Sequence, residues 1–198
     1  MSDMTAKRNY RLGRRGEAAE ETRRRIVEAT FDLHNAQGVA ATSMKQIADR
    51  AGVSVGTVYH HFPSYEDAIR ACSHHATVIG QPPDPALLAG IADRAERIAR
   101  LTAEVFGFYT RVPGYARVRA DEGQFPIVRQ FTRREEANRL ALVRVALGTP
   151  APGEDRVQAV AAMLDIVVFQ ALTRAGLTAE RAAAEMAAII VAGLGDGF

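Results

Sequence analysis

The single cysteine of the chain, Cys72, is followed closely by His74 and His75, which are the residue types of a nucleophile and its base. Residues two or three positions apart on a helix do not generally meet in attack geometry, and the sequence signals no third group to orient them. The pairs His60-His61 and His74-His75 also lack the i, i+4 spacing with which two helical histidines bind one zinc ion. No Gly-rich phosphate loop is present. The sequence therefore predicts no catalytic residues, no metal and no cofactor, and a small buried thiol at Cys72.

Three serines between positions 43 and 64 mark the starts of three expected helices. Ser43 and Gln46 have the spacing of a capping box, and Ser64 and Asp67 repeat it. Ser54 can serve as the N-cap of the helix between them. One such spacing is common by chance, but three in register, each before an apolar-periodic run, indicate real helix starts.

These helix starts enclose a helix-turn-helix. The first short helix is expected from about Met44 to Ala51, and Gly52 lies where the chain must turn and a positive φ is favoured. The second helix is expected from Ser54 to about Phe62. A preceding helix that ends near Gly38 carries an apolar face, and it completes the core because two short helices cannot bury one alone.

Residues 26–69 resemble the N-terminal domain of the TetR family of bacterial repressors. The matching pieces are Gly38, residues 42–48 (TSMKQIA), residues 51–54 (AGVS) and residues 56–62 (GTVYHHF). The resemblance covers about a quarter of the chain. It implies an N-terminal DNA-binding domain followed by a divergent helical domain that dimerises and binds a ligand.

Two positions depart from the family pattern. His34 stands where the family usually has an aromatic residue such as phenylalanine on the inner face of the first helix, and we expect it to be partly buried with a local hydrogen bond. Tyr65 stands where the family often has a lysine that contacts a DNA phosphate. A tyrosine hydroxyl can also donate to phosphate, but without the positive charge.

The early face of the second helix is expected to read DNA bases. There Thr57 can hydrogen-bond a base, Val55 can contact a thymine methyl, and Gly56 allows close approach of the backbone. Hydroxyls, backbone amides at helix starts and Lys45 are expected to hold phosphates. This helix contains no Arg or Lys, so the commonest guanine contact is absent from it. The predicted DNA-binding residues are Thr42, Ser43, Lys45, Ser54, Val55, Gly56, Thr57, Tyr59, His60 and Tyr65.

The chain is expected to be all-α because apolar residues recur at three- and four-residue steps. It should consist of an N-terminal three-helix helix-turn-helix domain and a larger C-terminal helical domain for ligand binding and dimerisation. Residues 1–19 are expected to form a basic flexible arm, residues 20–68 the DNA-binding domain and residues 69–198 the larger domain. The arm is either a phosphate contact or a solvated tail. Breaks at 80–85, 113–114, 123–126, 148–153 and 176 divide the larger domain into about five helices.

Two segments near the end, residues 159–172 and 182–194, are largely apolar and rich in small residues. Two such helices from each subunit can form a four-helix bundle, and the alternative is a core within one chain. We favour the homodimer because an operator with two-fold symmetry calls for a symmetric reader.

The larger domain also holds residues that could line a ligand pocket. Asp165 lies within an expected apolar helix and needs a partner if it is buried, which is either an arginine such as Arg174 across the dimer or a cationic ligand. Aromatic residues at helical spacing are more often core than ligand site. The predicted pocket residues are Phe106, Tyr109, Phe125, Phe131 and Asp165.

The sequence therefore predicts a dimeric repressor that binds palindromic double-stranded operator DNA and is released by a small-molecule effector. The alternative is a helical interaction or ligand-binding protein whose DNA-binding domain has degenerated. One cysteine, the charged N-terminus and the lack of an apolar run of membrane-spanning length favour a cytoplasmic protein with no membrane partner. The sequence identifies neither the operator nor the effector.

Overall fold

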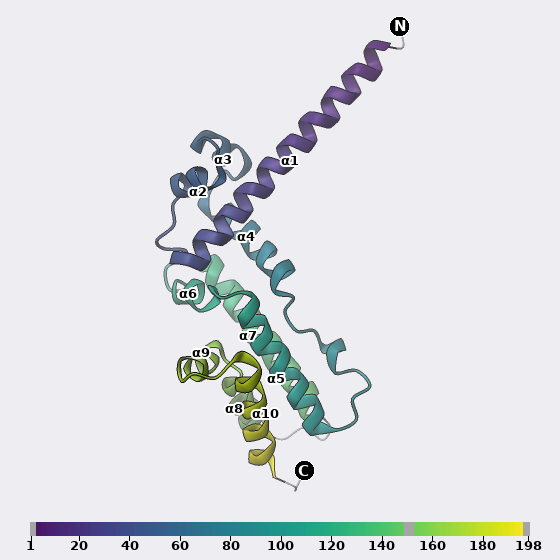
Figure 1. The fold of residues 1–198 in the computed structure, drawn as a ribbon, viewed down its shortest axis with the longest axis vertical. Helices are drawn as coiled ribbons and strands as arrows, with labels where there is room; N and C mark the ends of the chain where they lie inside the picture. Colours follow the sequence, from purple (N-terminus) through teal and green to yellow (C-terminus); the bar gives the residue numbers. More distant parts are fainter. Residues whose placement is uncertain (1–2, 149–152, 196–198) are drawn as a thin grey trace. The chain divides into compact units, whose positions relative to one another are not determined.

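The computed structural model describes the backbone of residues 3–148 and 153–195 and the side chains from residue 16 onward (Figure 1). Every regular element within these residues is a helix, which confirms the all-α prediction. The chain divides into two compact units, Met1–His75 and Ala76–Phe198. The domain boundary expected from the sequence, 68/69, and the division between the units fall within the same helix, α4.

The first unit contains α1 (Asp3–Gln37), α2 (Met44–Ala51), α3 (Val55–His61) and most of α4 (Tyr65–Gly80). In Figure 1, α2 and α3 lie beside the second half of α1. Segment 1–19, expected as an arm, is helical from Asp3, and its flexibility in solution stays a prediction. The core of this unit is apolar and comes from all four helices; its most deeply buried members are Ile26, Ile47, Ala48, Val58 and Ala68.

The predicted helix starts are confirmed in the first unit. Ser43 and Gln46 form a reciprocal capping box, with the Gln46 amide 3.3 Å from Ser43 Oγ and the Ser43 amide 2.9 Å from Gln46 Oε1. Ser64 and Asp67 form the same arrangement before α4. Gly52 ends α2 with φ 67°, in the left-handed region that glycine adopts at low cost. The turn between α2 and α3 is therefore fixed by local chemistry.

Within the described residues, the second unit contains the end of α4, a short 3₁₀ helix and six further α-helices. Besides α4, they are η1 (Pro85–Leu88), α5 (Arg94–Arg111), α6 (Tyr115–Ala120), α7 (Pro126–Leu147), α8 (Glu154–Met163), α9 (Ile166–Arg174) and α10 (Ala179–Leu194). The helix α5 lies at the centre of this unit and packs against both α7 and α10. Its fully buried side chains include Leu101, Phe106 and Tyr109.

Asp165 corrects the prediction of one continuous apolar helix over residues 159–172. The helix α8 ends at Met163, and Asp165 is the N-cap of α9, where its side chain accepts from the Val167 amide at 3.0 Å. Aspartate favours this position because its carboxylate satisfies a free helical amide. The chain therefore changes direction at Asp165.

Among the described residues, no single helix is both long and apolar enough to span a membrane. One pair, Glu154–Met163 with Ile166–Arg174, passes that test together by length and composition and is bent by 43°.

Candidate nucleic-acid interface

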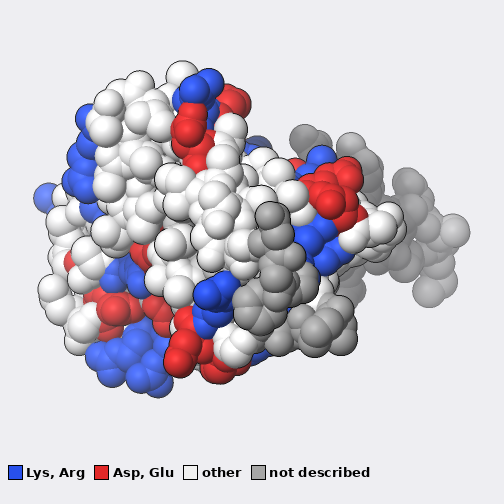
Figure 2. All heavy atoms as spheres, turned by 90° about the horizontal axis from the view of Figure 1, so that it is seen from below, with Lys and Arg blue, Asp and Glu red and all other residues white. Residues whose placement is uncertain are grey.

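Overall charge does not identify a nucleic-acid surface on this protein. The net charge is only +2, and Figure 2 shows one face on which acidic and basic groups are interspersed, with a broad uncharged area between them. A net charge of +2 does not indicate where a nucleic acid would bind, so the interface must be located from individual residues around α2 and α3.

The helix α3 has a buried side and an exposed side. Val58 is fully buried in the core, whereas Ser54, Gly56, Tyr59 and His60 are exposed. Tyr59 keeps half of its surface open to solvent although it is a large aromatic residue. An exposed tyrosine beside an exposed glycine and hydroxyls is a surface suited to a polar partner.

Ser54 and Thr57 form a pair at the start of α3. Ser54 Oγ accepts from the Thr57 amide at 3.0 Å and lies 2.8 Å from Thr57 Oγ1. Because one hydrogen bond between two hydroxyls uses only one of their two protons, the other proton remains able to donate outward. This proton and the half-buried Val55 lie on the part of α3 that was predicted to read bases.

Three predicted phosphate contacts have hydroxyl protons that serve the protein itself. Thr42 is buried and donates to Gly38 O at 2.7 Å, and Ser43 Oγ donates to Gln46 Oε1 at 2.9 Å. The Tyr65 hydroxyl donates to Val39 O at 2.7 Å. None of these three hydroxyls can donate to a phosphate without losing a bond that holds the turn before α2 or the cap of α2.

Tyr65 contacts His34, the other position that departs from the family pattern. Its hydroxyl lies 2.9 Å from His34 Nε2, and His34 Nδ1 lies 3.4 Å from Cys72 Sγ. His34 is 3% exposed and thus more deeply buried than expected, and these two partners lie 31 and 38 residues away along the chain, not locally. Burial raises the pKa of the Cys72 thiol to about 12, so this thiol is protonated at neutral pH.

Two arginines of α1 lie against the helix-turn-helix and were missed in the sequence. Arg25 Nη1 donates to Ala51 O at 3.2 Å, directly before the turn, and Arg23 lies over the Phe62 ring at 5.1 Å. Both are exposed, and among the described residues neither forms an ion pair, whereas Arg24 between them binds Glu21 and Glu28. The run of three arginines before the apolar face of α1 was the signal available in the sequence.

The aromatic and charged residues expected around a pocket separate into two groups in the second unit. Tyr109 and Asp165 meet at Arg139, which donates to the Tyr109 hydroxyl at 3.3 Å and to Asp165 Oδ2 at 3.0 Å, and Phe106 lies against Tyr109. Phe125 is the N-cap residue of α7, and Phe131 lies on that helix.

Asp165 belongs to a cluster of ion pairs within the chain, and a pairing with Arg174 across a dimer stays a prediction. Its partners are Arg119, with Nη1 at 2.6 Å, and Arg139. These arginines also bind Glu136 and Glu135, while Arg174 Nε donates to Gln170 O in its own helix. Burial alone would raise the pKa of Asp165, but the Val167 amide and both arginines hold it below its ordinary value. Asp165 is therefore ionised at neutral pH.

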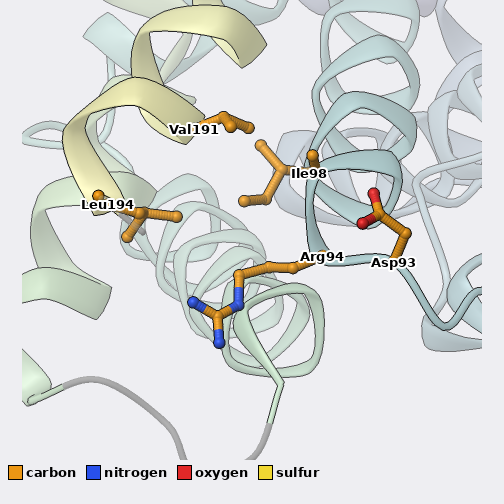
Figure 3. Close-up of a pocket in the computed structure, with 7 residues that line it drawn as sticks. Asp93, Arg94, Ile98, Val191 and Leu194 are labelled. Atoms are coloured by element: carbon orange, nitrogen blue, oxygen red, sulfur yellow. The ribbon is translucent and has the colours of Figure 1, made fainter. Parts of the chain in front are cut away.

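A cavity of about 290 Å³ lies elsewhere in the second unit, between the start of α5 and the end of α10. Figure 3 shows Ile98 and Val191 pointing toward one another across it, with Asp93 and Arg94 extending in different directions at the start of α5. None of the five predicted pocket residues lines this cavity. Among the described residues, no group of three or more His, Cys, Asp or Glu side chains is arranged to hold a metal ion.

The fold and surface of the first unit define a helix-turn-helix domain of the DNA-binding class. Residues 26–72 match the model of the family described as bacterial regulatory proteins, tetR family, and the predicted resemblance is confirmed. The HTH-type transcriptional regulator SrpR of Pseudomonas putida is 45% identical over 53 residues, which are 27% of this chain and 25% of SrpR. The chain thus matches about a quarter of the length of this relative.

The whole chain has the fold of solved transcriptional regulators. NalD of Pseudomonas aeruginosa, the secondary repressor of the MexAB-OprM multidrug efflux pump, aligns with a TM-score of 0.66 and 18% identity over 91% of this chain and 100% of its own. The multidrug binding protein EbrR, solved with imidazole, aligns with a TM-score of 0.59 and 20% identity over 86% of this chain and 89% of its own. At these identities the likeness establishes the fold.

Proposed function

We propose that this protein is a sequence-specific regulator of transcription that binds palindromic double-stranded DNA as a homodimer. The observation that carries the proposal is the family match over residues 26–72, which covers a helix-turn-helix whose α3 presents Gly56, Tyr59 and the Ser54–Thr57 hydroxyl pair to solvent. Repression is the favoured outcome because the structural neighbour NalD is a repressor. Such a regulator acts in the cytoplasm, where its DNA lies.

The DNA-binding surface that we propose combines predicted and newly found residues. Thr57 and Val55 read bases from the start of α3, and Gly56 allows the backbone to approach. Lys45, Tyr59, His60 and the arginines Arg23 and Arg25 hold phosphates on either side. The two arginines supply positive charge that α3 itself lacks. Thr42, Ser43 and Tyr65 act inside the protein, where they hold the loop and helix starts that shape this surface.

The dimer that we propose forms through α8, α9 and α10. Val167 is 61% exposed and Ile189 is 53% exposed, although both are aliphatic. Small or apolar neighbours on the same helices are also exposed: Ala159, Ala162, Met163, Ala188 and Ala192. An apolar surface of this kind on packed helices is typical of a protein interface. The opposite side of α10 is used by the packing against α5, so the exposed side is available to a second copy.

A small-molecule effector is the third part of the proposal. The second unit offers the cavity between Ile98 and Val191 and the aromatic cluster around Arg139. EbrR is a multidrug binding protein of the same fold. The two recognition helices of a dimer must reach successive major grooves roughly 34–36 Å apart. An effector that binds the second unit better when α4 is displaced would change this separation and so lower DNA affinity.

The experiment that tests DNA reading is selection of the purified protein against a random duplex pool. We expect a palindromic motif with half-sites one helical turn apart. On that motif, Thr57→Ala should raise Kd roughly tenfold and leave the Kd for random duplex almost unchanged, because one base contact is lost. The matched control is Thr110→Ala on α5, outside the proposed dimer surface, whose hydroxyl donates to Phe106 O within its own helix.

Selection of no motif would favour the alternative function, a helical interaction or ligand-binding protein that no longer binds DNA. Equal losses on both duplexes would assign Thr57 to the DNA backbone instead of the bases. The dimer is tested separately by light scattering. Val167→Asp and Ile189→Asp should give monomers, whereas Val145→Asp, at an exposed apolar position on α7, should remain dimeric.

A further inference from the structure

The first part of α1 projects beyond the core of the first unit. Ile26 is fully buried, whereas residues 16–25 are exposed apart from the half-buried Thr22. At about 1.5 Å per residue, the helical stretch from Asp3 to Arg25 extends about 34 Å beyond Ile26. Figure 1 shows this part of α1 continuing past α2 and α3. The described side chains of this stretch therefore add little to the core.

The basic residues of this stretch share one side of the helix. Successive residues of an α-helix are about 100° apart, so positions 7, 8, 11, 14 and 15 fall within an arc of about 120°. The sequence fills these positions with Lys7, Arg8, Arg11, Arg14 and Arg15. These five positions are called the basic face of α1. The helix thus gathers on one side the positive charge that the sequence distributes over nine residues.

The acidic residues of the same stretch do not neutralise the basic face. In the same helical register, Glu17 and Glu20 lie about 120° or more from the centre of the arc. Helical side chains pair at spacings of three or four residues, and no acidic residue stands at those spacings from positions 8, 11 and 15. Glu21 pairs with Arg24 at 2.7 Å, outside the arc. The basic face therefore suits an anionic partner.

Arg25 connects the basic face with the helix-turn-helix. Its position falls within the same arc, and its Nη1 donates to Ala51 O at 3.2 Å, directly before the turn between α2 and α3. The basic face begins about 15 Å further along α1, at position 15. Both regions belong to the first unit. One side of α1 therefore carries positive charge outward from the surface that we propose for DNA.

We propose that the basic face of α1 is a second DNA-binding element, which holds phosphates about 15–27 Å along α1 from Arg25. The proposal rests on the DNA-binding function proposed above and adds a site to it. A duplex presents one negative charge about every 1.7 Å along its axis, whatever its sequence. The basic face therefore raises affinity for every duplex, while α3, which contains no Arg or Lys, reads the bases.

The test moves charges around α1 without changing the composition of the chain. The off-face variant combines Ala6→Arg with Arg8→Ala and Asn9→Arg with Arg11→Asn, which carries two charges out of the arc. Its association constants for the selected duplex and for a random duplex are measured between about 50 and 200 mM salt. We expect the slope of log association constant against log salt concentration to become shallower by about 0.9 for each lost phosphate contact, about 1.8 in all, on both duplexes.

The matched control, the on-face variant, moves two charges along the arc. It combines Met4→Arg with Arg8→Met and Arg11→Ala with Ala18→Arg, and it should keep the wild-type slope. Arg24→Gln, outside the arc, removes a charge that pairs with Glu21 and Glu28, and it should also leave the slope unchanged. An unchanged slope in the off-face variant, or an equal loss in both rearranged variants, would overturn the proposal, because the side of the helix would then not matter.

The random duplex separates the basic face from the reading of bases. A shallower slope on it in the off-face variant, when selection yields no motif, would retain the basic face and reject sequence-specific binding. A selected motif with unchanged slopes would reject the basic face alone. Vesicles of phosphatidylglycerol test another anionic surface. Weaker vesicle binding by the off-face variant, together with unchanged slopes on both duplexes, would overturn the proposal in favour of a membrane surface.

Discussion

The two units bury polar side chains of different charge. The first unit holds hydrogen bonds from Cys72 through His34 to Tyr65, whereas the second holds ion pairs around Arg139 and Asp165. An uncharged hydrogen bond contributes only about 1 kcal/mol net, because water offers a similar bond when it breaks. A buried charge that loses its partner has no such alternative and costs roughly 3–5 kcal/mol. The first arrangement therefore suits a contact that must be released, and the second suits one that must not move.

This difference fits the places of the two clusters in the fold. The ion pairs join α6, α7 and the start of α9, so they hold three helices of one unit together. The hydrogen bonds of His34 with Tyr65 and Cys72 hold α4 against α1 within the first unit. Because each such bond contributes only about 1 kcal/mol, this contact is released more easily than the ion pairs.

Asp165→Ala is the change with the largest expected effect. It removes one of the two carboxylates that pair with Arg139, which is 6% exposed and keeps Glu135, and it removes the N-cap of α9. We expect a loss of roughly 2–4 kcal/mol in the free energy of unfolding, measured by urea denaturation, from the charged hydrogen bonds and the cap together. Tyr65→Phe should cost only about 1 kcal/mol. Similar losses for the two variants would contradict the contrast between the units.

A pH titration tests the same contrast without removing a side chain. The pKa of Asp165 is lower in the folded protein than its ordinary value of 3.8, so its contribution is complete above that value and is lost as the pH falls below it. The free energy of unfolding should therefore decrease below about pH 3.8. Asp165→Asn, which can still cap α9, should reduce this slope, while Tyr65→Phe should leave it unchanged. A slope that is equal in both variants would assign the acid sensitivity to other carboxylates.

The first unit could be predicted from the sequence more fully than the second. Its helix starts depend on local pairs such as Ser43–Gln46 and on Gly52, which act over three or four residues and are readable in the sequence. The contacts of Arg25 with Ala51 and of Tyr65 with His34 join residues 26 and 31 positions apart, and they decide which hydroxyls face outward. Sequence reasoning therefore located the helix-turn-helix but could not show that the hydroxyls of Thr42, Ser43 and Tyr65 donate within the protein, and their contacts with DNA stay a prediction.

In the second unit the missing information was three-dimensional. An aspartate among apolar residues is compatible with a charge buried inside a helix and also with a helix break at which the aspartate caps the next helix. The segment around Asp165 contains no glycine or proline, so its sequence does not decide between the two. Its partners Arg119 and Arg139 lie 46 and 26 residues away.

Exposed ion pairs should have the smallest effect and should not distinguish the units. Arg50–Asp32 in the first unit and Arg144–Glu154 in the second each have an N–O distance of 2.7 Å, with every side chain about half exposed. Double-mutant cycles should give coupling below about 1 kcal/mol for both, since water screens each pair. Adding 1 M NaCl should abolish what remains. A clearly stronger ion pair in the second unit would indicate that the electrostatics of the whole unit stabilise its buried cluster. Burial of Arg139 would then no longer explain the difference between the two units.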